Sequence, residues 1–333
     1  MQKVKNIDRL LHINGKYQWG AYKNSVYKSL DGGLTWHFFS KLKSSTLSSI
    51  VSKFRLFARL LRLQIDYLIP IDNKVVVFAY KKIYVFDENA KEVNESPIVG
   101  SKPLSVCCSD GKLYYGEYCS NRERKEIRIF CSENSGIDWE VAWEFSSVRH
   151  VHGVFVDPYD NSIWVTTGDS NDEAAIWRTD DGFKTLDKIL TGSQQVRAVH
   201  LLFDEQFVYY GSDAPAEENY IYRMCKSTFE IQKLTEVGNS VFFACKVGDN
   251  LFFSTAVEPS EVNLSKHSEI WHSRTGQDWS KVCSFKKDRL SMKYFQYGQI
   301  SFPNGNGDNE NLWFTPNALK YDNCTFRIPI NSL

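Results

Sequence analysis

The chain has 333 residues, in which 40 Lys and Arg balance 40 Asp and Glu, and its pI is about 7.0. This balance argues against a nucleic-acid partner, which would favour a surplus of basic residues. We find no N-terminal apolar stretch of the signal-peptide type and no run near the roughly 18 apolar residues of a membrane-spanning helix. The eight cysteines are scattered without CxxC spacing, so we expect reduced thiols in a cytoplasmic protein that uses no metal or other cofactor.

The first recognisable element is an eight-residue motif at 29–36, Ser-Leu-Asp-Gly-Gly-Leu-Thr-Trp, which follows a strand-like segment. Asp31 can accept hydrogen bonds from backbone N–H groups of its own turn, and Gly33 can adopt the positive φ that such a turn needs. Trp36 can pack between neighbouring units. The motif therefore predicts a stabilised turn in a hairpin. We do not expect Asp31 to be a catalytic acid, because the motif recurs along the chain.

The next element is a predicted amphipathic helix at 44–67, inserted between the first and second repeat units. Its apolar face has helical 3, 4 spacing and consists of Leu47, Ile50, Val51, Phe54, Phe57, Ala58, Leu61 and Ile65. Its basic residues lie off that face and are Lys53, Arg55, Arg59 and Arg62. Three interpretations remain open: a helix packed on the flank of the domain, a docking helix for a partner protein, or an interfacial helix whose residues 47–65 bind an anionic membrane.

Weaker copies of the motif begin at Ser132, Thr179 and Ser273, and the four starts are separated by one or two multiples of about 47 residues. The same spacing predicts degenerate units near residues 86, 225 and 321. Each unit has the length of a four-stranded propeller blade. We therefore expect a single all-β domain over 1–333, a β-propeller with seven blades, or six if the first and last segments share one blade.

These motifs resemble the Asp-box (BNR) repeats of sialidase-like β-propellers, a layout related to propeller glycoside hydrolases and polysaccharide lyases. The resemblance implies that the motif turns lie between the third and fourth strands of a blade. Sialidases carry a Phe/Tyr-Arg-Ile-Pro motif ahead of their boxes, whereas here Phe326–Pro329 follows every box. We interpret this match as chance, with a circular shift at ring closure as the alternative, and we do not expect true sialidase activity.

Candidate site residues come from two positions in the blades that lie near the axis of one face, the end of strand two and the start of strand one. Strand two is followed by a carboxylate in four units, at Glu117, Asp169, Asp213 and Glu258. The starts of inner strands add Arg149, His150, His152, Arg197 and Tyr297. The period of two places both histidines on one side of their strand. We expect these groups to form the rim of a central pocket.

This combination of side chains suits chemistry on an acidic glycan. Arginines hold substrate carboxylates bidentately, so we assign Arg149 and Arg197 to substrate binding, together with Asp213 and Glu117. Glycoside hydrolysis uses paired carboxylates, and Asp169 or Glu258 would be its acid or base.

The alternative reaction is β-elimination beside a uronic acid carboxylate, with His150 or His152 as the base and Tyr297 as the acid. We expect an enzyme that cleaves or modifies an acidic glycan, in a role such as bacterial surface-polysaccharide metabolism. The alternative function is a non-catalytic glycan- or protein-binding propeller that is held at a membrane.

Overall fold

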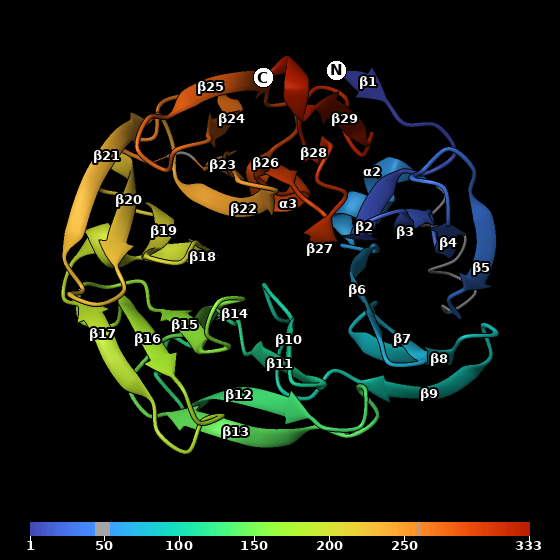
Figure 1. Ribbon diagram of the computed structural model, residues 1–333, viewed down its shortest axis with the longest axis horizontal. Coiled ribbons are helices and arrows are strands. Elements are labelled where there is room, and N and C mark those ends of the chain that lie inside the picture. The colour runs from blue at the N-terminus through green and yellow to red at the C-terminus, as the bar shows by residue number, and fades with distance from the viewer. Residues whose placement is uncertain (44–53, 259) are drawn as a thin grey trace.

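The computed structural model describes residues 1–43, 54–258 and 260–333, and nearly all of its regular structure is β-strand. The strands form sheets arranged side by side around a central axis, as the blades of a β-propeller are (Figure 1). Within the successive sheets, the first strand along the chain lies nearest the axis and later strands lie farther out. The all-β propeller architecture predicted from the motifs is confirmed.

The sheets follow one another along the chain. The first contains β2 (Arg9–Asn14), β3 (Tyr17–Tyr22), β4 (Ser25–Ser29) and β5 (His37–Lys41), with β27 (Asn304–Gly307) parallel to β2. The second contains β6 (Ile65–Ile71), β7 (Lys74–Ala79), β8 (Lys82–Asp87) and β9 (Glu92–Pro97). The third contains β10 (Cys107–Ser109), β11 (Lys112–Gly116), β12 (Ile127–Ser132) and β13 (Glu140–Phe145). The fourth contains β14 (Val151–Val156), β15 (Ile163–Thr167), β16 (Ala175–Thr179) and β17 (Asp187–Thr191). The fifth contains β18 (Ala198–Phe203), β19 (Phe207–Ser212), β20 (Asn219–Cys225) and β21 (Ile231–Val237).

The last sheet joins the two ends of the chain. Its first strands are β22 (Val241–Val247), β23 (Asn250–Val257), β24 (His267–Ser273) and β25 (Ser280–Lys286). It continues through β26 (Gly298–Ser301), β28 (Asn311–Asn317) and β29 (Phe326–Pro329), and ends with β1 (Gln2–Lys3). Gln2 pairs with Arg327 across β1 and β29, so the termini lie together at the outer edge (Figure 1). Arg327 belongs to the Phe-Arg-Ile-Pro match, and its Nε donates to Gln2 Oε1 at 2.9 Å.

The hydrophobic core lies between neighbouring sheets, because the central strands bury side chains on both faces. On β7, every residue from 75 to 79 is buried. Val77 packs in one cluster with Trp19 of the preceding sheet, whereas Val76 packs in another with Leu113 of the following sheet. Alternate residues of one strand therefore serve two sheet interfaces, which fixes each sheet against both neighbours.

The motif turns have the predicted construction. The turn at 29–36 joins β4 to β5, and Asp31 Oδ1 accepts from the backbone N–H groups of Leu34 and Thr35 at 3.1 and 2.9 Å. Gly33 has φ +82°, a conformation that suits glycine. Asn134 and Asp181 accept from the N–H groups four residues later in the turns after β12 and β16. These side chains are therefore used in turn formation, as expected for Asp31.

The inserted helix differs from its prediction in extent and orientation. Helix α2 spans Arg55–Leu60, while Ile65 opens β6 and is buried, so the predicted helix is wrong beyond residue 60. Ile65 pairs with Ala79 of β7, and this strand pairing overrides the helical periodicity. The predicted residues 44–53 lie outside the described residues.

The basic side of α2 faces the protein. Arg59 is buried, and its Nη1 lies 2.5 Å from Asp288 while its Nη2 donates to the Phe295 carbonyl at 2.6 Å. Arg55 pairs with Asp322 at 2.7 Å. Phe54, Leu56, Phe57, Leu60 and Leu61 are all exposed. The arginines expected to be solvated or lipid-facing therefore hold the helix to the domain, and the apolar side chains face outward.

The remaining helical segments are short. Helix α3 (Met292–Phe295) contacts α2 beside the central axis (Figure 1), and the 3-10 helices among the described residues are η1 (Gln194–Val196) and η2 (Ile330–Ser332). In the part of the chain that the structure describes, no helix has the length and apolar character needed to cross a membrane.

Candidate functional site

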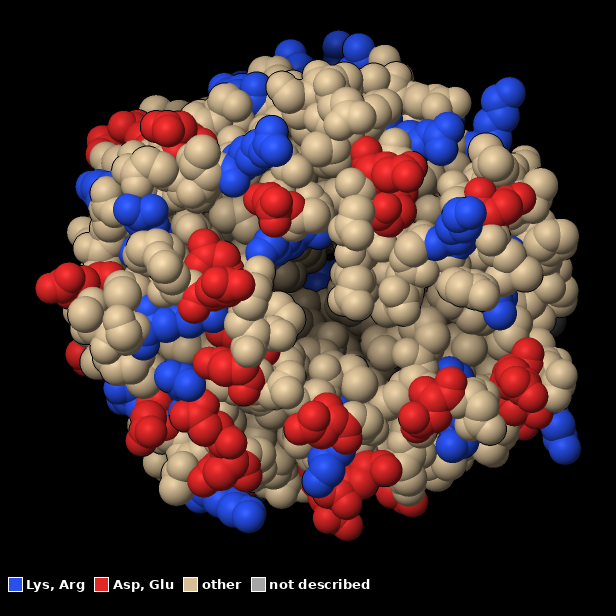
Figure 2. All heavy atoms as spheres, viewed as in Figure 1, with Lys and Arg blue, Asp and Glu red and all other residues tan. Residues whose placement is uncertain are grey.

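A pocket of about 1280 Å³ occupies the centre of the propeller, where Figure 2 shows the face to be hollowed. Its lining comes from the inner strands of several sheets, from α3 and from the segment that follows α2. The predicted rim residues among this lining are His152, Arg197, Asp213, Glu258 and Tyr297. The ring therefore brings together residues that are more than 140 positions apart in the chain.

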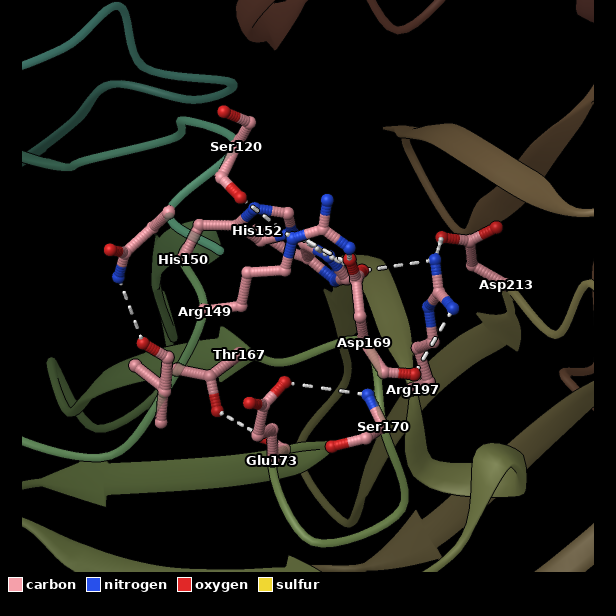
Figure 3. Close-up of polar contacts among 12 residues, drawn as sticks. Ser120, Arg149, His150, His152, Thr167, Asp169, Ser170, Glu173, Arg197 and Asp213 are labelled. Carbon is pink, nitrogen blue, oxygen red and sulfur yellow. Dashed lines mark hydrogen bonds and ion pairs between the residues drawn. The ribbon is translucent and has the colours of Figure 1, made fainter. Parts of the chain in front are cut away.

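Asp169 is positioned by a tight turn after β15. Gly168 has φ +98°, and a Cβ at this residue would lie 2.1 Å from the carbonyl carbon and oxygen of Glu173. The Thr167 hydroxyl also donates to the Glu173 carbonyl, at 2.9 Å. Only glycine fits at the second turn position, and the sequence Thr-Gly-Asp directs Asp169 toward His152 and Arg197 (Figure 3).

Asp169 is the centre of a polar cluster. Its Oδ1 lies 3.2 Å from His150 Nε2, 3.4 Å from His152 Nε2 and 3.1 Å from Arg197 Nη2. Its Oδ2 accepts from Arg149. Burial acts to raise the pKa of Asp169, but its contacts with the two histidines and the charge of Arg197 outweigh burial and hold the pKa well below its usual range. Asp169 is thus an ionised carboxylate and an unsuitable proton donor.

The two histidines are buried and anchored by backbone carbonyls. His150 Nδ1 lies 2.8 Å from the Cys119 carbonyl oxygen, and His152 Nδ1 lies 3.1 Å from that of Ala198. Their Nε2 atoms are 3.0 Å apart. Burial lowers the pKa of His152 against the opposing effect of Asp169. The Tyr118 ring packs on His150 with centroids 4.3 Å apart, closing the cluster on one side.

Arg197 connects this cluster to a second carboxylate. Its Nη2 lies 3.1 Å from Asp169 Oδ1 and 3.1 Å from Asp213 Oδ2 (Figure 3). Asp213 is 4% exposed, and its Oδ1 has no hydrogen-bond partner among the described residues. Asp213, a residue of the pocket lining, thus has one oxygen held by Arg197 and a second, buried oxygen without a partner among the described residues.

Glu258 and Tyr297 form a second group at the same pocket. Burial, with the nearby negative charge of Asp213, raises the pKa of Glu258 to about 7, although Arg197 and a hydrogen bond with Tyr297 oppose the shift. Burial and the Glu258 charge also raise the pKa of Tyr297. At neutral pH Glu258 is therefore poised between its acid and base forms, as a proton-transfer group requires.

The structure brings together eight of the nine predicted site residues in two groups and leaves out one. The first group is Arg149, His150, His152, Asp169, Arg197 and Asp213, and the second is Glu258 and Tyr297. Glu117 is apart from both. It is buried, accepts from the Arg128 N–H at 2.9 Å and does not line the pocket, so the expectation that it shares the rim is wrong. Its carboxylate satisfies backbone on its own sheet instead.

Two residues that line the pocket were not predicted from the sequence. Tyr118 lines the pocket beside His152, and the only signal for it was its place directly after Glu117. Arg62 also lines the pocket, because the chain turns back toward the axis after α2, and nothing in the helical periodicity indicated this turn. Both lie on connections rather than strands.

Comparison with known proteins supports the fold only. No protein-family model and no curated protein matches the chain. YCF48 from Cyanidioschyzon merolae is similar with a TM-score of 0.62 and 10% identity, over 100% of this chain and 99% of that one. YCF48 bound to D1 peptide is similar with a TM-score of 0.61 and 8% identity, over 98% and 95%. An ancestral GH74 enzyme matches with a TM-score of 0.54 and 11% identity, over 94% of this chain and 49% of that one. These likenesses show a β-propeller fold, which hosts many functions.

Proposed function

We propose that this chain hydrolyses a glycosidic bond of an acidic oligosaccharide in the central pocket, with Glu258 as the proton donor and Asp213 as the ionised partner carboxylate. The observation that carries the proposal is that two carboxylates in different environments line one pocket. Burial raises the pKa of Glu258 to about 7, whereas the Asp213 carboxylate forms an ion pair with the Arg197 guanidinium. Glycoside hydrolysis requires such a division between a protonated and an ionised carboxyl group.

In this mechanism Glu258 donates its proton to the leaving oxygen as the glycosidic bond breaks. The hydroxyl of Tyr297 hydrogen-bonds with Glu258 and orients the carboxyl group. The Asp213 carboxylate, whose Oδ2 lies 3.1 Å from Arg197, stabilises the positive charge that develops on the sugar. Whether Asp213 attacks carbon or activates water depends on the carboxyl separation in the substrate complex.

The arrangement of the histidines supports hydrolysis over elimination. His150 and His152 are 3% and 2% exposed, and their Nε2 atoms point toward each other and toward Asp169. A general base must come within hydrogen-bond distance of the proton that it removes. Two buried rings in mutual contact suit that role poorly, so the base of the eliminative alternative has little support.

Acidic sugars are favoured by the cations along the pocket. Arg149 and Arg197, the expected carboxylate clamp, are already paired with Asp169 and Asp213. Arg62 and Lys293 line the same pocket and are the better candidates for contacting a substrate carboxylate.

Two isosteric variants test the mechanism on a panel of uronate- and sialate-containing oligosaccharides. Glu258→Gln should lower kcat roughly 10²–10⁴-fold with little change in KM, because it removes only proton donation. Aryl glycosides with acidic leaving groups should be affected much less. Asp213→Asn should lower turnover of both substrate types, and Glu261→Gln, at an exposed position, is the matched control. No turnover of any substrate by wild type would overturn the proposal.

The second candidate is a non-catalytic propeller that binds a glycan or a protein and is held at a membrane. The exposed apolar residues of α2 beside the pocket favour it. YCF48 with its D1 peptide illustrates that a propeller of this kind can bind a peptide. Calorimetric binding without product would support this candidate. A cytoplasmic location with peripheral attachment remains part of it.

We also propose that the ring has seven blades related to sialidase-like Asp-box propellers. The turns that begin at Ser29, Ser132, Thr179 and Ser273 support the relationship, since the serine or threonine hydroxyl in each accepts a backbone N–H. The set β26, β28, β29 and β1 supports the count as a final blade closed by the N-terminal strand.

A further inference from the structure

Three side chains that can ligate a metal ion converge beside the pocket. His150 Nε2, His152 Nε2 and Asp169 Oδ1 lie 3.0, 3.2 and 3.4 Å from one another. We propose that these three side chains bind one divalent transition-metal ion, and Zn²⁺, which binds imidazole nitrogen and carboxylate oxygen, is the ion chosen to test it. The proposal is independent of the hydrolytic function, since neither Glu258 nor Asp213 belongs to the ligand set.

Backbone carbonyls determine which ring nitrogen of each histidine carries the proton. A carbonyl oxygen only accepts hydrogen bonds, so the contacts with Cys119 and Ala198 require a proton on Nδ1 of both His150 and His152. A neutral imidazole then has a lone pair on Nε2. Both Nε2 lone pairs and Asp169 Oδ1 then face one another at hydrogen-bond distance without a proton between them, while Arg197 Nη2 donates to Asp169 Oδ1 from its other side. A cation between these atoms would satisfy all three.

The distances between the three ligand atoms agree with those around a bound zinc ion. Zinc binds imidazole nitrogen and carboxylate oxygen at roughly 2.0–2.2 Å, which places neighbouring ligand atoms about 3.3 Å apart in a tetrahedral site and about 3.0 Å apart in an octahedral one. The separations of the His150, His152 and Asp169 atoms, between 3.0 and 3.4 Å, span these values. The side chains therefore need little movement to coordinate an ion.

The hydrogen bonds that the three side chains make with surrounding groups also resemble those of a metal site. Metal-binding histidines donate their second N–H to a carbonyl or carboxylate, and metal-binding carboxylates are themselves hydrogen-bonded. Both histidines have such carbonyl contacts, and Asp169 is held by Arg149 and Arg197. His152 lies on β14 and Asp169 follows β15, so the ligands stand on adjacent paired strands. The arginine charges oppose a cation, and the competing arrangement is a proton shared between the two Nε2 atoms.

The experiment titrates chelator-treated, full-length protein with Zn²⁺ in a calorimeter and with Co²⁺ in a spectrophotometer. We expect one equivalent of Zn²⁺ to bind with a Kd below about 1 µM, and Co²⁺ to develop the visible bands of nitrogen and oxygen coordination. Zn²⁺ should also raise the Tm of the wild-type protein.

Two variants assign the binding to this cluster. Asp169→Asn keeps the shape of the side chain and should weaken Zn²⁺ binding at least about 100-fold, as should His152→Ala. His267→Ala, at an exposed position, is the matched control and should bind as wild type does. Absence of saturable Zn²⁺ and Co²⁺ binding by wild type would overturn the proposal in favour of the shared proton. Unchanged binding in folded Asp169→Asn would overturn it too, by locating the ion elsewhere.

Discussion

Arg197 lies between Asp169 and Asp213, and one nitrogen, Nη2, is 3.1 Å from an oxygen of each. The side chain is largely buried, as are both carboxylates. One guanidinium therefore compensates two negative charges at the wall of the pocket, and the geometry of the two carboxylates depends on it.

Replacing Arg197 should destabilise the folded protein. Arg197→Met leaves Asp213 buried and without its cation, and we expect a loss of roughly 3–5 kcal/mol in the free energy of unfolding. Urea denaturation measures it. Arg122→Met, at an exposed position, should stay within about 0.5 kcal/mol of wild type. Equal losses in the two variants would show that the bridge contributes no specific stability.

The raised pKa of Glu258 predicts a pH-dependent stability. The unfolded carboxyl titrates near 4.5 and the folded one near 7, so the folded state binds more protons in between and stability falls as pH rises through this window. Glu258→Gln cannot ionise and should therefore match wild type below about pH 4. Above pH 7 it should be more stable by at most about 3 kcal/mol. Thermal unfolding at pH 4 and pH 8 measures the difference, and the opposite pH trend would contradict the assignment.

Gly168 should tolerate no side chain. Gly168→Ala combines a positive φ with a Cβ 2.1 Å from the Glu173 carbonyl, so we expect a loss of at least about 2 kcal/mol and displacement of Asp169. Gly192→Ala is the matched control, because Gly192 has φ +90° but open space around its Cβ position. It should lose only about 1 kcal/mol. Urea denaturation compares them, and an equal loss would mean that the contact with Glu173 is relieved without cost.

The exposed apolar side of α2 predicts a membrane interaction that differs from the basic-helix expectation. Phe57 and Leu61 are 51% and 57% exposed, whereas Arg55 and Arg59 pair with carboxylates of the domain. Binding to anionic vesicles should therefore depend on apolar contact and change little with salt. Co-sedimentation should be lost in Phe57→Ser and in Leu61→Ser.

The control for this measurement is Leu34→Ser, which removes an even more exposed leucine from the turn between β4 and β5. Pelleting of this variant should equal that of wild type. If wild type fails to pellet with anionic vesicles, or if all three variants pellet alike, α2 is not a membrane-binding element.

The repeated local patterns in the sequence were sufficient for the propeller architecture and for its turns. A hydroxyl, a carboxylate or amide and a positive-φ residue within eight positions form their contacts inside one hairpin, as Asp31 and Asp181 do. Repetition at about 47 residues then requires stacked sheets, because one such sheet cannot bury its own faces. These features depend on neighbours in the sequence, and for that reason they could be predicted.

The tertiary structure decided what the side chains do. Glu117 and Asp169 follow equivalent strands of their sheets. Glu117 accepts a hydrogen bond from the backbone of its own sheet, whereas Asp169 pairs with Arg197, which precedes the next sheet. Arg59 turned inward because Asp288, 229 residues away in the chain, offers it a carboxylate. Ring closure sets these partners, and burial and charge at each position then set protonation and orientation. Such contacts join residues that have no fixed spacing in the sequence, so no local sequence pattern predicts them.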